Sequence, residues 1–113
     1  MEGSGMPQVL MLPGPRIRQE EVEQVRQLIY AELEKSGSLV LDMGAVEFVE
    51  SAFLGLLIRA LKHATSRGGN LHLCAVQKPV ANILALMRLN RVFEIFETAE
   101  AARAEGIRGK SAG

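Results

Sequence analysis

Few side chains in this sequence could take part in catalysis or metal binding. The single cysteine, Cys74, stands within an apolar run, which favours a buried, unreactive thiol. The histidines His63 and His72 have no second ligand at a metal-binding spacing, which favours one solvated and one structural ring. No phosphate-binding glycine motif occurs. The sequence therefore predicts neither a metal site nor a cofactor.

Acidic residues are the remaining candidates for acid–base chemistry. Asp42 is expected to end a strand, and Glu47 and Glu50 are expected on the loop that follows. Carboxylates at such positions are far more often solvated or helix-capping than catalytic. A small enzyme that uses Cys74, or the Asp42 and Glu50 carboxylates, is therefore kept only as an alternative.

Composition excludes several classes of function. The chain has 113 residues, 48% of them hydrophobic and 23% charged, which predicts one folded domain. Its formal net charge of +0 and 4% aromatic content speak against a nucleic-acid partner. No apolar run approaches the roughly 20 residues of a membrane span, so direct membrane insertion is not expected. One cysteine and no export signal favour a reducing cytoplasm.

The spacing of apolar residues predicts four strands that alternate with four helices. Strands are expected at 8–12, 38–43, 71–76 and 91–96, and helices at 19–35, 51–66, 79–87 and 99–105. A short extended piece is expected at 46–48. This alternation is typical of an α/β fold with a mostly parallel sheet covered by helices. The domain is expected to span 8–105, with flexible tails at 1–7 and 106–113.

One segment of the sequence carries a family pattern. It reads LVLDMGAVEFVESAFLGLLIRALKHATSRGG, from Leu39 to Gly69. The order of a strand-end aspartate (Asp42), a short loop, a Ser-x-x-Leu-Gly motif from Ser51 to Gly55 and an apolar helix resembles the STAS domain of bacterial anti-sigma-factor antagonists. The downstream stretches NLHLCAV and LALMRLNRVFEIFETAEAA also fit, with Arg88 where the family usually has glycine. The resemblance implies a four-stranded STAS-type fold.

Three positions depart from the usual motif, Asp-Ser-[Ser/Thr]-Gly-Leu-Gly. Glu50 replaces the aspartate, Ala52 replaces the family's phosphorylatable Ser or Thr, and Phe53 replaces a glycine. Ser51 keeps a hydroxyl, but we expect its oxygen to cap the helix, which makes it a poorer phosphate acceptor. The family usually begins with two strands, whereas this sequence predicts only one.

The resemblance implies a non-enzymatic binding module that switches between protein partners. The partner would be an anti-sigma factor, often a GHKL-type protein kinase, and loss of the usual acceptor suggests constitutive binding. The runner-up is a STAS subunit of a larger assembly, such as a stress-signalling scaffold or a lipid-transport ABC complex; a homodimer is also left open. The predicted partner-binding residues are Asp42, Glu50, Ser51, Ala52, Phe53, Leu54 and Ile58.

The predicted helix over 51–66 has more apolar surface than one sheet face requires. At about 100° per residue its apolar positions cover an arc of roughly 200°. Leu54 and Ile58 lie at the edge of this arc, beside Ser51. We therefore expect both side chains to contribute more to partner binding than to stability.

Overall fold

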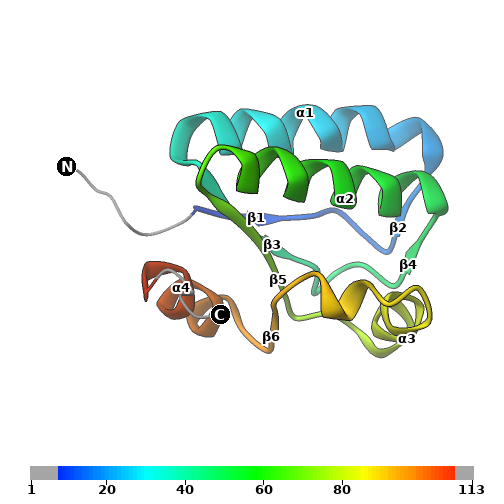
Figure 1. Ribbon diagram of the computed structural model, residues 1–113. Helices are drawn as coiled ribbons and strands as arrows, with labels where there is room; N and C mark the ends of the chain where they lie inside the picture. Colours follow the sequence, from blue (N-terminus) through cyan, green and yellow to red (C-terminus); the bar gives the residue numbers. More distant parts are fainter. Residues whose placement is uncertain (1–7, 109–113) are drawn as a thin grey trace.

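A four-stranded parallel sheet forms the centre of the computed structural model, which describes residues 8–108 (Figure 1). Its strands are β1 (Gln8–Met11), β3 (Ser38–Asp42), β5 (Asn70–Cys74) and β6 (Ile95–Phe96), in the order β1-β3-β5-β6. The expected α/β fold, with a four-stranded parallel sheet covered by helices, is confirmed. Two short strands, β2 (Arg16–Ile17) and β4 (Phe48–Val49), form a separate parallel pair.

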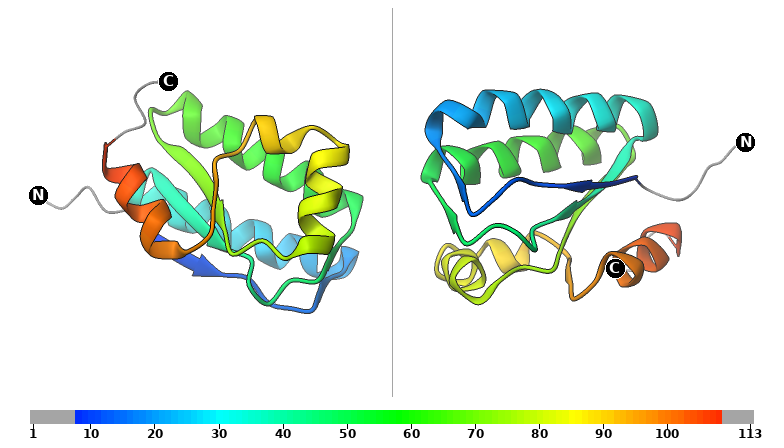
Figure 2. Two further views of the ribbon diagram at one scale, coloured as in Figure 1. Left: turned by 90° about the horizontal axis from the view of Figure 1, so that it is seen from below. Right: turned by 180° about the vertical axis from the view of Figure 1, so that it is seen from behind.

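Helices cover both faces of the sheet. The long helices α1 (Gln19–Ser36) and α2 (Ser51–Ser66) lie together on one face, and α4 (Ala99–Arg108) lies on the other (Figures 1 and 2). The shorter α3 (Lys78–Leu86) packs beside β4, and the 3₁₀ helix η1 (Leu89–Arg91) follows it. Figure 1 shows α3 near β2 and β4, at the opposite end of the sheet from α4.

The two central strands are buried on both faces. Leu39 and Leu41 of β3 belong to the large core beneath α1 and α2, whereas Val40 packs on the other side with Cys74 and with Ala102 of α4. A parallel strand that is covered twice has to be apolar at successive positions. This constraint explains why the apolar runs at 38–43 and 71–76 correctly predicted β3 and β5.

Two glycines allow the chain to enter these strands. Gly37 ends α1 with a φ of 80°, a left-handed conformation that glycine adopts at little cost. A Cβ on Gly69 would lie only 1.7 Å from the carbonyl oxygen of Gly37, so a larger residue cannot fit there. The starts of β3 and β5 are therefore brought into register by a close backbone contact.

The expectation of a single strand before the first helix was wrong. The Pro13–Pro15 segment ends β1, but the chain then forms β2, whose Ile17 is fully buried. The carbonyl oxygen of Pro15 accepts hydrogen bonds from the N–H groups of Glu47 and Phe48, at 2.7 and 3.1 Å. A two-residue strand is too short for periodicity to reveal, and its pairing depends on the distant β4.

The prediction of a strand over 91–96 was also wrong for most of this segment. Only Ile95–Phe96 is a strand, and the preceding residues form η1 and its end. Val92 is exposed and Phe93 packs into the large core, so neighbouring apolar side chains at the end of η1 point alternately to solvent and to the core. A short apolar alternation does not by itself distinguish a strand from such a turn.

The remaining boundaries agree closely with expectation, except that α4 runs to Arg108 and the predicted domain ended at 105. The expected tail at 1–7 lies outside the described residues; of the tail expected at 106–113, residues 106–108 belong to α4 and 109–113 lie outside the described residues. Within the described part of the chain, no helix is both long and apolar enough to cross a membrane.

Truncation of a central strand residue tests the core assignment. Leu73 is fully buried in β5, so Leu73→Ala should lower the free energy of unfolding by about 2–5 kcal/mol. The matched control is Leu28→Ala on α1, where the side chain is 50% exposed and the loss should stay below about 1 kcal/mol. Chemical denaturation measures both, and equal losses would contradict the assignment.

Candidate functional site

The chain crosses one end of the sheet between β3 and α2, and a set of polar contacts holds this crossing in place. Asp42 at the end of β3 accepts a hydrogen bond through Oδ1 from the Gly44 N–H, at 2.9 Å. Gln77, just before α3, donates through Nε2 to the carbonyl oxygen of Gly44, at 2.6 Å. Val46 is fully buried. Asp42 is therefore a structural residue of the loop, and its carboxylate is half-buried.

The strand β4 places an aromatic ring on the surface next to the start of α2. Phe48 is 42% exposed, and the guanidinium carbon of Arg16 lies 5.2 Å from the centre of its ring. Such a cation–π contact orients both side chains. The sequence analysis did not single out Phe48, which it expected only as part of a short extended piece at 46–48.

The first turn of α2 has unsatisfied backbone donors. The N–H groups of Phe53 and Leu54 both donate to the carbonyl oxygen of Glu50, at 2.9 and 3.2 Å. The N–H groups of Ser51 and Ala52 have no hydrogen-bond partner within the described chain. Together with the helix dipole, these donors make the start of α2 favourable for a negatively charged or carbonyl group of a partner.

The expectation that Ser51 caps α2 was wrong. Glu50 is the N-cap residue, in an extended conformation with φ −95° and ψ 163°, and no side chain caps this helix. Ser51 is the first helical residue, its side chain is exposed, and its hydroxyl forms no hydrogen bond within the described chain. Because β4 ends at Val49, the extended backbone that a cap requires falls on Glu50.

The residues after Ser51 alternate between the surface and the core. Ala52 is half-exposed, whereas Phe53 is fully buried and Leu54 is 6% exposed. Phe53 thus packs inward, and the expectation that Leu54 serves binding rather than stability was wrong. Ile58 is half-buried and packs against the core. The wide apolar arc of α2 is covered by α1 as well as by the sheet, which leaves less of it exposed than the sequence suggested.

The surroundings of Cys74 speak against the alternative of a small enzyme that uses this thiol as its nucleophile. Cys74 is fully buried, and burial raises the pKa of its thiol to about 11, with a further contribution from the charges of Asp42 and Glu100. A protonated, enclosed thiol is neither a nucleophile nor a metal ligand. No group of three metal-binding side chains occurs among the described residues.

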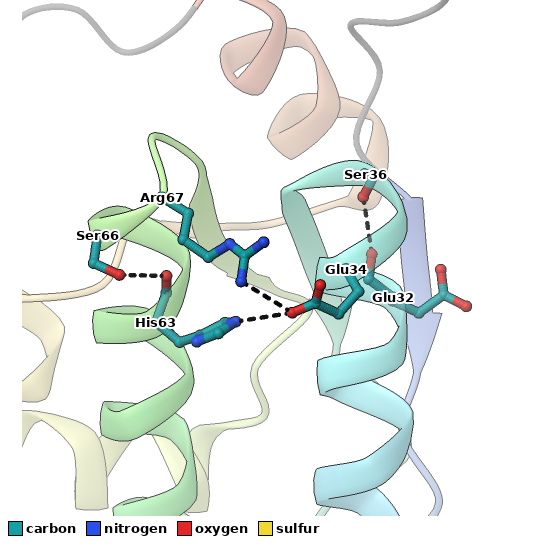
Figure 3. A network of polar contacts seen from close by, with 6 residues as sticks. All are labelled: Glu32, Glu34, Ser36, His63, Ser66 and Arg67. Atoms are coloured by element: carbon teal, nitrogen blue, oxygen red, sulfur yellow. Dashed lines mark hydrogen bonds and ion pairs between the residues drawn. The ribbon is translucent and has the colours of Figure 1, made fainter.

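The histidines have structural surroundings. His72 is buried in β5, with its ring 5.4 Å from that of Phe96 in an edge-to-face arrangement. His63 lies near the end of α2, where its Nε2 is 3.3 Å from Oε2 of Glu34 on α1; Arg67 donates to the same oxygen at 3.2 Å (Figure 3). These partly exposed contacts join the two helices at the end remote from Ser51 and contribute at most about 1 kcal/mol.

Comparison with known proteins places this arrangement in a family. The family model described as the STAS domain matches residues 2–102. The chain belongs to the STAS domain family. A Thermotoga maritima protein named "putative anti-sigma factor antagonist" is 26% identical to this STAS domain over 99 residues, which cover 86% of this chain and 88% of that protein.

Solved structures show the same fold. An anti-sigma-factor antagonist (STAS) domain protein from Planctomyces limnophilus superposes with a TM-score of 0.79 at 26% identity, covering 87% of this chain and 88% of that chain. The anti-sigma factor antagonist SpoIIAA in its unphosphorylated form superposes with a TM-score of 0.76 at 19% identity, covering 98% and 96%. This second likeness shows the fold alone.

The buried thiol predicts a distinct chemical behaviour. Because the pKa of Cys74 in the folded STAS domain is about 11 against an ordinary 9.0, iodoacetamide at pH 8 should modify the folded protein at least about a hundredfold more slowly than the denatured protein. The unfolded chain loses the thiol proton first, so stability should fall as the pH rises from about 9 towards 11. Mass spectrometry follows the modification.

The control for this measurement is Cys74→Ala, which should lack the part of the pH-dependent stability loss that comes from the thiol. Rapid modification of the folded wild-type protein at pH 8 would contradict the burial of Cys74. It would then favour the alternative of a small enzyme that uses this thiol.

Proposed function

We propose that this STAS domain is a non-enzymatic, cytoplasmic binding module of the anti-sigma-factor-antagonist type. Its partner is an anti-sigma factor or a GHKL-type protein kinase, and the complex forms through the start of α2. The names of the relatives in Thermotoga maritima and Planctomyces limnophilus support this class of function. The lack of a buried polar reaction centre among the described residues is consistent with binding rather than turnover.

The proposed contact area is called the α2 docking surface. It comprises the exposed or half-exposed residues Phe48, Glu50, Ser51, Ala52 and Ile58. It combines an aromatic side chain with free helix N–H groups, two features that give a partner both apolar contact area and directional hydrogen bonds. Asp42 supports this surface by holding the Gly44 backbone. Phe53 and Leu54 support it from the core and are not part of it.

The observation that carries the proposal is the half-exposed methyl group of Ala52 in the first turn of α2. By resemblance to the family motif, this position normally presents a hydroxyl that a kinase can phosphorylate. A phosphate there adds a charge of about −1.5 to −2 and opposes docking of the partner. Ala52 has no atom that can accept a phosphate, so we infer that binding at the α2 docking surface is constitutive.

Ser51 is the one hydroxyl left in this turn. Its side chain is exposed and is not engaged as a helix cap, so a kinase that tolerated a shift of one residue could reach it. On a helix the next residue is turned by about 100°, which places the Ser51 oxygen outside the direction of the family acceptor. We therefore treat Ser51 as a contact residue first and as a weaker phosphate acceptor second.

A second candidate function follows from the same alanine. A STAS subunit of a larger assembly, such as a stress-signalling scaffold or a lipid-transport ABC complex, would need the shape of the domain without a phosphate switch. Purification of the tagged chain from its source cell separates the two, because a GHKL-type kinase supports the first function and a transporter ATPase supports the second.

A charged variant tests the α2 docking surface. Ala52→Asp places a carboxylate among the free N–H groups of α2, where the helix dipole favours it by about 0.3–1 kcal/mol. The variant should therefore fold at least as stably as wild type, while its affinity for the purified anti-sigma factor or kinase should fall at least about tenfold. Isothermal titration calorimetry measures the affinity.

The matched control is Ala101→Asp, which adds the same charge to an exposed alanine in the first turn of α4. It should leave partner binding unchanged. Equal affinities for Ala52→Asp and wild type would rule out the α2 docking surface as the contact area.

A further inference from the structure

The side chain of Gln77 links the start of α3 to the loop that leads into α2. Its Nε2 donates to the carbonyl oxygen of Gly44 at 2.6 Å, across 33 residues of sequence. The N–H of the same glycine donates to Oδ1 of Asp42 at 2.9 Å. Both backbone groups of Gly44 are therefore held by side chains from two different elements, the end of β3 and the start of α3.

The hydrogen bond from Gln77 is not needed to satisfy a buried polar group. Gly44 and the next residue, Ala45, are exposed, so water can reach this turn. The side chains on either side of the turn, Met43 and Val46, are fully buried, and the Val46 N–H donates to the Met43 carbonyl oxygen at 3.0 Å. A side-chain bond to an exposed turn adds only modestly to stability, but it restricts where the turn can lie.

The contact made by Gln77 takes the place of a helix cap. Gln77 is the N-cap residue of α3, with an extended backbone of φ −73° and ψ 157°, and its side chain makes no capping hydrogen bond. Ser, Thr, Asp and Asn stabilise an N-cap, because their short side chains reach the N–H groups of the first turn. Here a longer side chain reaches another loop instead. The helix α3 thus lacks a side-chain cap at the residue that holds the Gly44 turn.

Two residues before Gln77 the backbone is strained. Ala75 has a φ of 57°, in the left-handed region that disfavours residues with a Cβ. Its N–H donates to the carbonyl oxygen of Phe96 at 3.0 Å, and the Cys74 carbonyl oxygen accepts from the Met43 N–H at 2.9 Å. Strain of this kind persists where surrounding contacts determine the conformation, often next to a functional site. Here it directs the chain from β5 into the segment that carries Gln77.

The turn that Gln77 holds lies directly before the α2 docking surface. Three residues separate Gly44 from Phe48, and the N–H groups of Glu47 and Phe48 donate to the carbonyl oxygen of Pro15. The helix α3 also packs beside β4, which carries Phe48 (Figure 1). The short chain before the aromatic ring is therefore held at both ends, by Gln77 at one and by Pro15 at the other.

We propose that Gln77 is a positioning residue of the α2 docking surface. It holds the Gly44 turn, and through it Phe48, in the conformation that the partner binds, and it acts through this turn rather than by touching the partner. A loop that is ordered before binding loses less conformational entropy on binding. The hydrogen bond therefore raises affinity more than stability. This inference rests on the proposed function, because it concerns the affinity of the α2 docking surface.

The variant Gln77→Ser separates positioning from stability, because serine is too short to reach Gly44 but is a good N-cap residue. The melting temperature of the full chain should stay at the wild-type value or rise. Affinity for the purified anti-sigma kinase, measured by isothermal titration calorimetry, should fall about three- to tenfold, as expected for the loss of one hydrogen bond. The matched control Gln24→Ser makes the same change at an exposed glutamine of α1 and should leave the affinity unchanged.

Amide hydrogen exchange follows the turn without any partner. In Gln77→Ser the N–H groups of Val46 and Phe48 should exchange at least about threefold faster than in wild type, because the turn opens locally. The N–H of Leu57, in the middle of α2, should exchange no faster than in wild type. Unchanged exchange at Val46 and Phe48 would overturn the proposal, because the turn would then not depend on Gln77.

The binding data can overturn the proposal in separate ways. Wild-type affinity of Gln77→Ser, when Ala52→Asp has lost binding, would leave the α2 docking surface intact and remove the role of Gln77. A melting temperature that falls together with the affinity would assign Gln77 a merely structural role. If Ala52→Asp and Gln77→Ser both bind like wild type, the contact area lies elsewhere, and the proposed function fails together with this inference.

Discussion

The buried ring of Phe53 fixes the geometry on which the proposed function depends. Phe53 is the third residue of α2 and is fully buried, with Leu54 beside it at 6% exposure. A helix whose third and fourth residues are locked into a core cannot rotate, so the first and second residues must face outward. For this reason the side chains of Ser51 and Ala52 lie at the surface. The family motif has glycine at the Phe53 position, so this chain holds the turn by side-chain packing.

The sequence predicted those parts of the fold that follow from local periodicity. β3 and β5 are recognisable because a strand covered on both faces has to be apolar throughout, and α1 and α2 because their apolar residues recur every three to four positions. β2 and β6 depend on pairing with distant segments: Ile17 pairs with Val49, and Ile95 with Leu73. Two-residue strands of this kind carry almost no periodic signal of their own.

The candidate site could be predicted by position but not in detail. The motif located the start of α2, but residue type alone suggested that Ser51 caps the helix and that Leu54 faces a partner. The cap falls on Glu50 because β4 extends to Val49, and Leu54 is buried because its side chain packs into the large core. Phe48 lies at the surface because it belongs to β4, whose pairing with β2 could not be predicted from the sequence. Each difference arises from a tertiary contact.

Constitutive docking at the start of α2 is the central claim, and one comparison tests it most directly. The wild-type chain and Ala52→Ser are each incubated with the purified anti-sigma kinase, with and without ATP, and the complex and the intact mass are measured together. The account predicts that wild type stays unmodified and bound in ATP, whereas Ala52→Ser gains a phosphate and is released. Phosphorylation of wild type at Ser51, with release of the kinase, would contradict it.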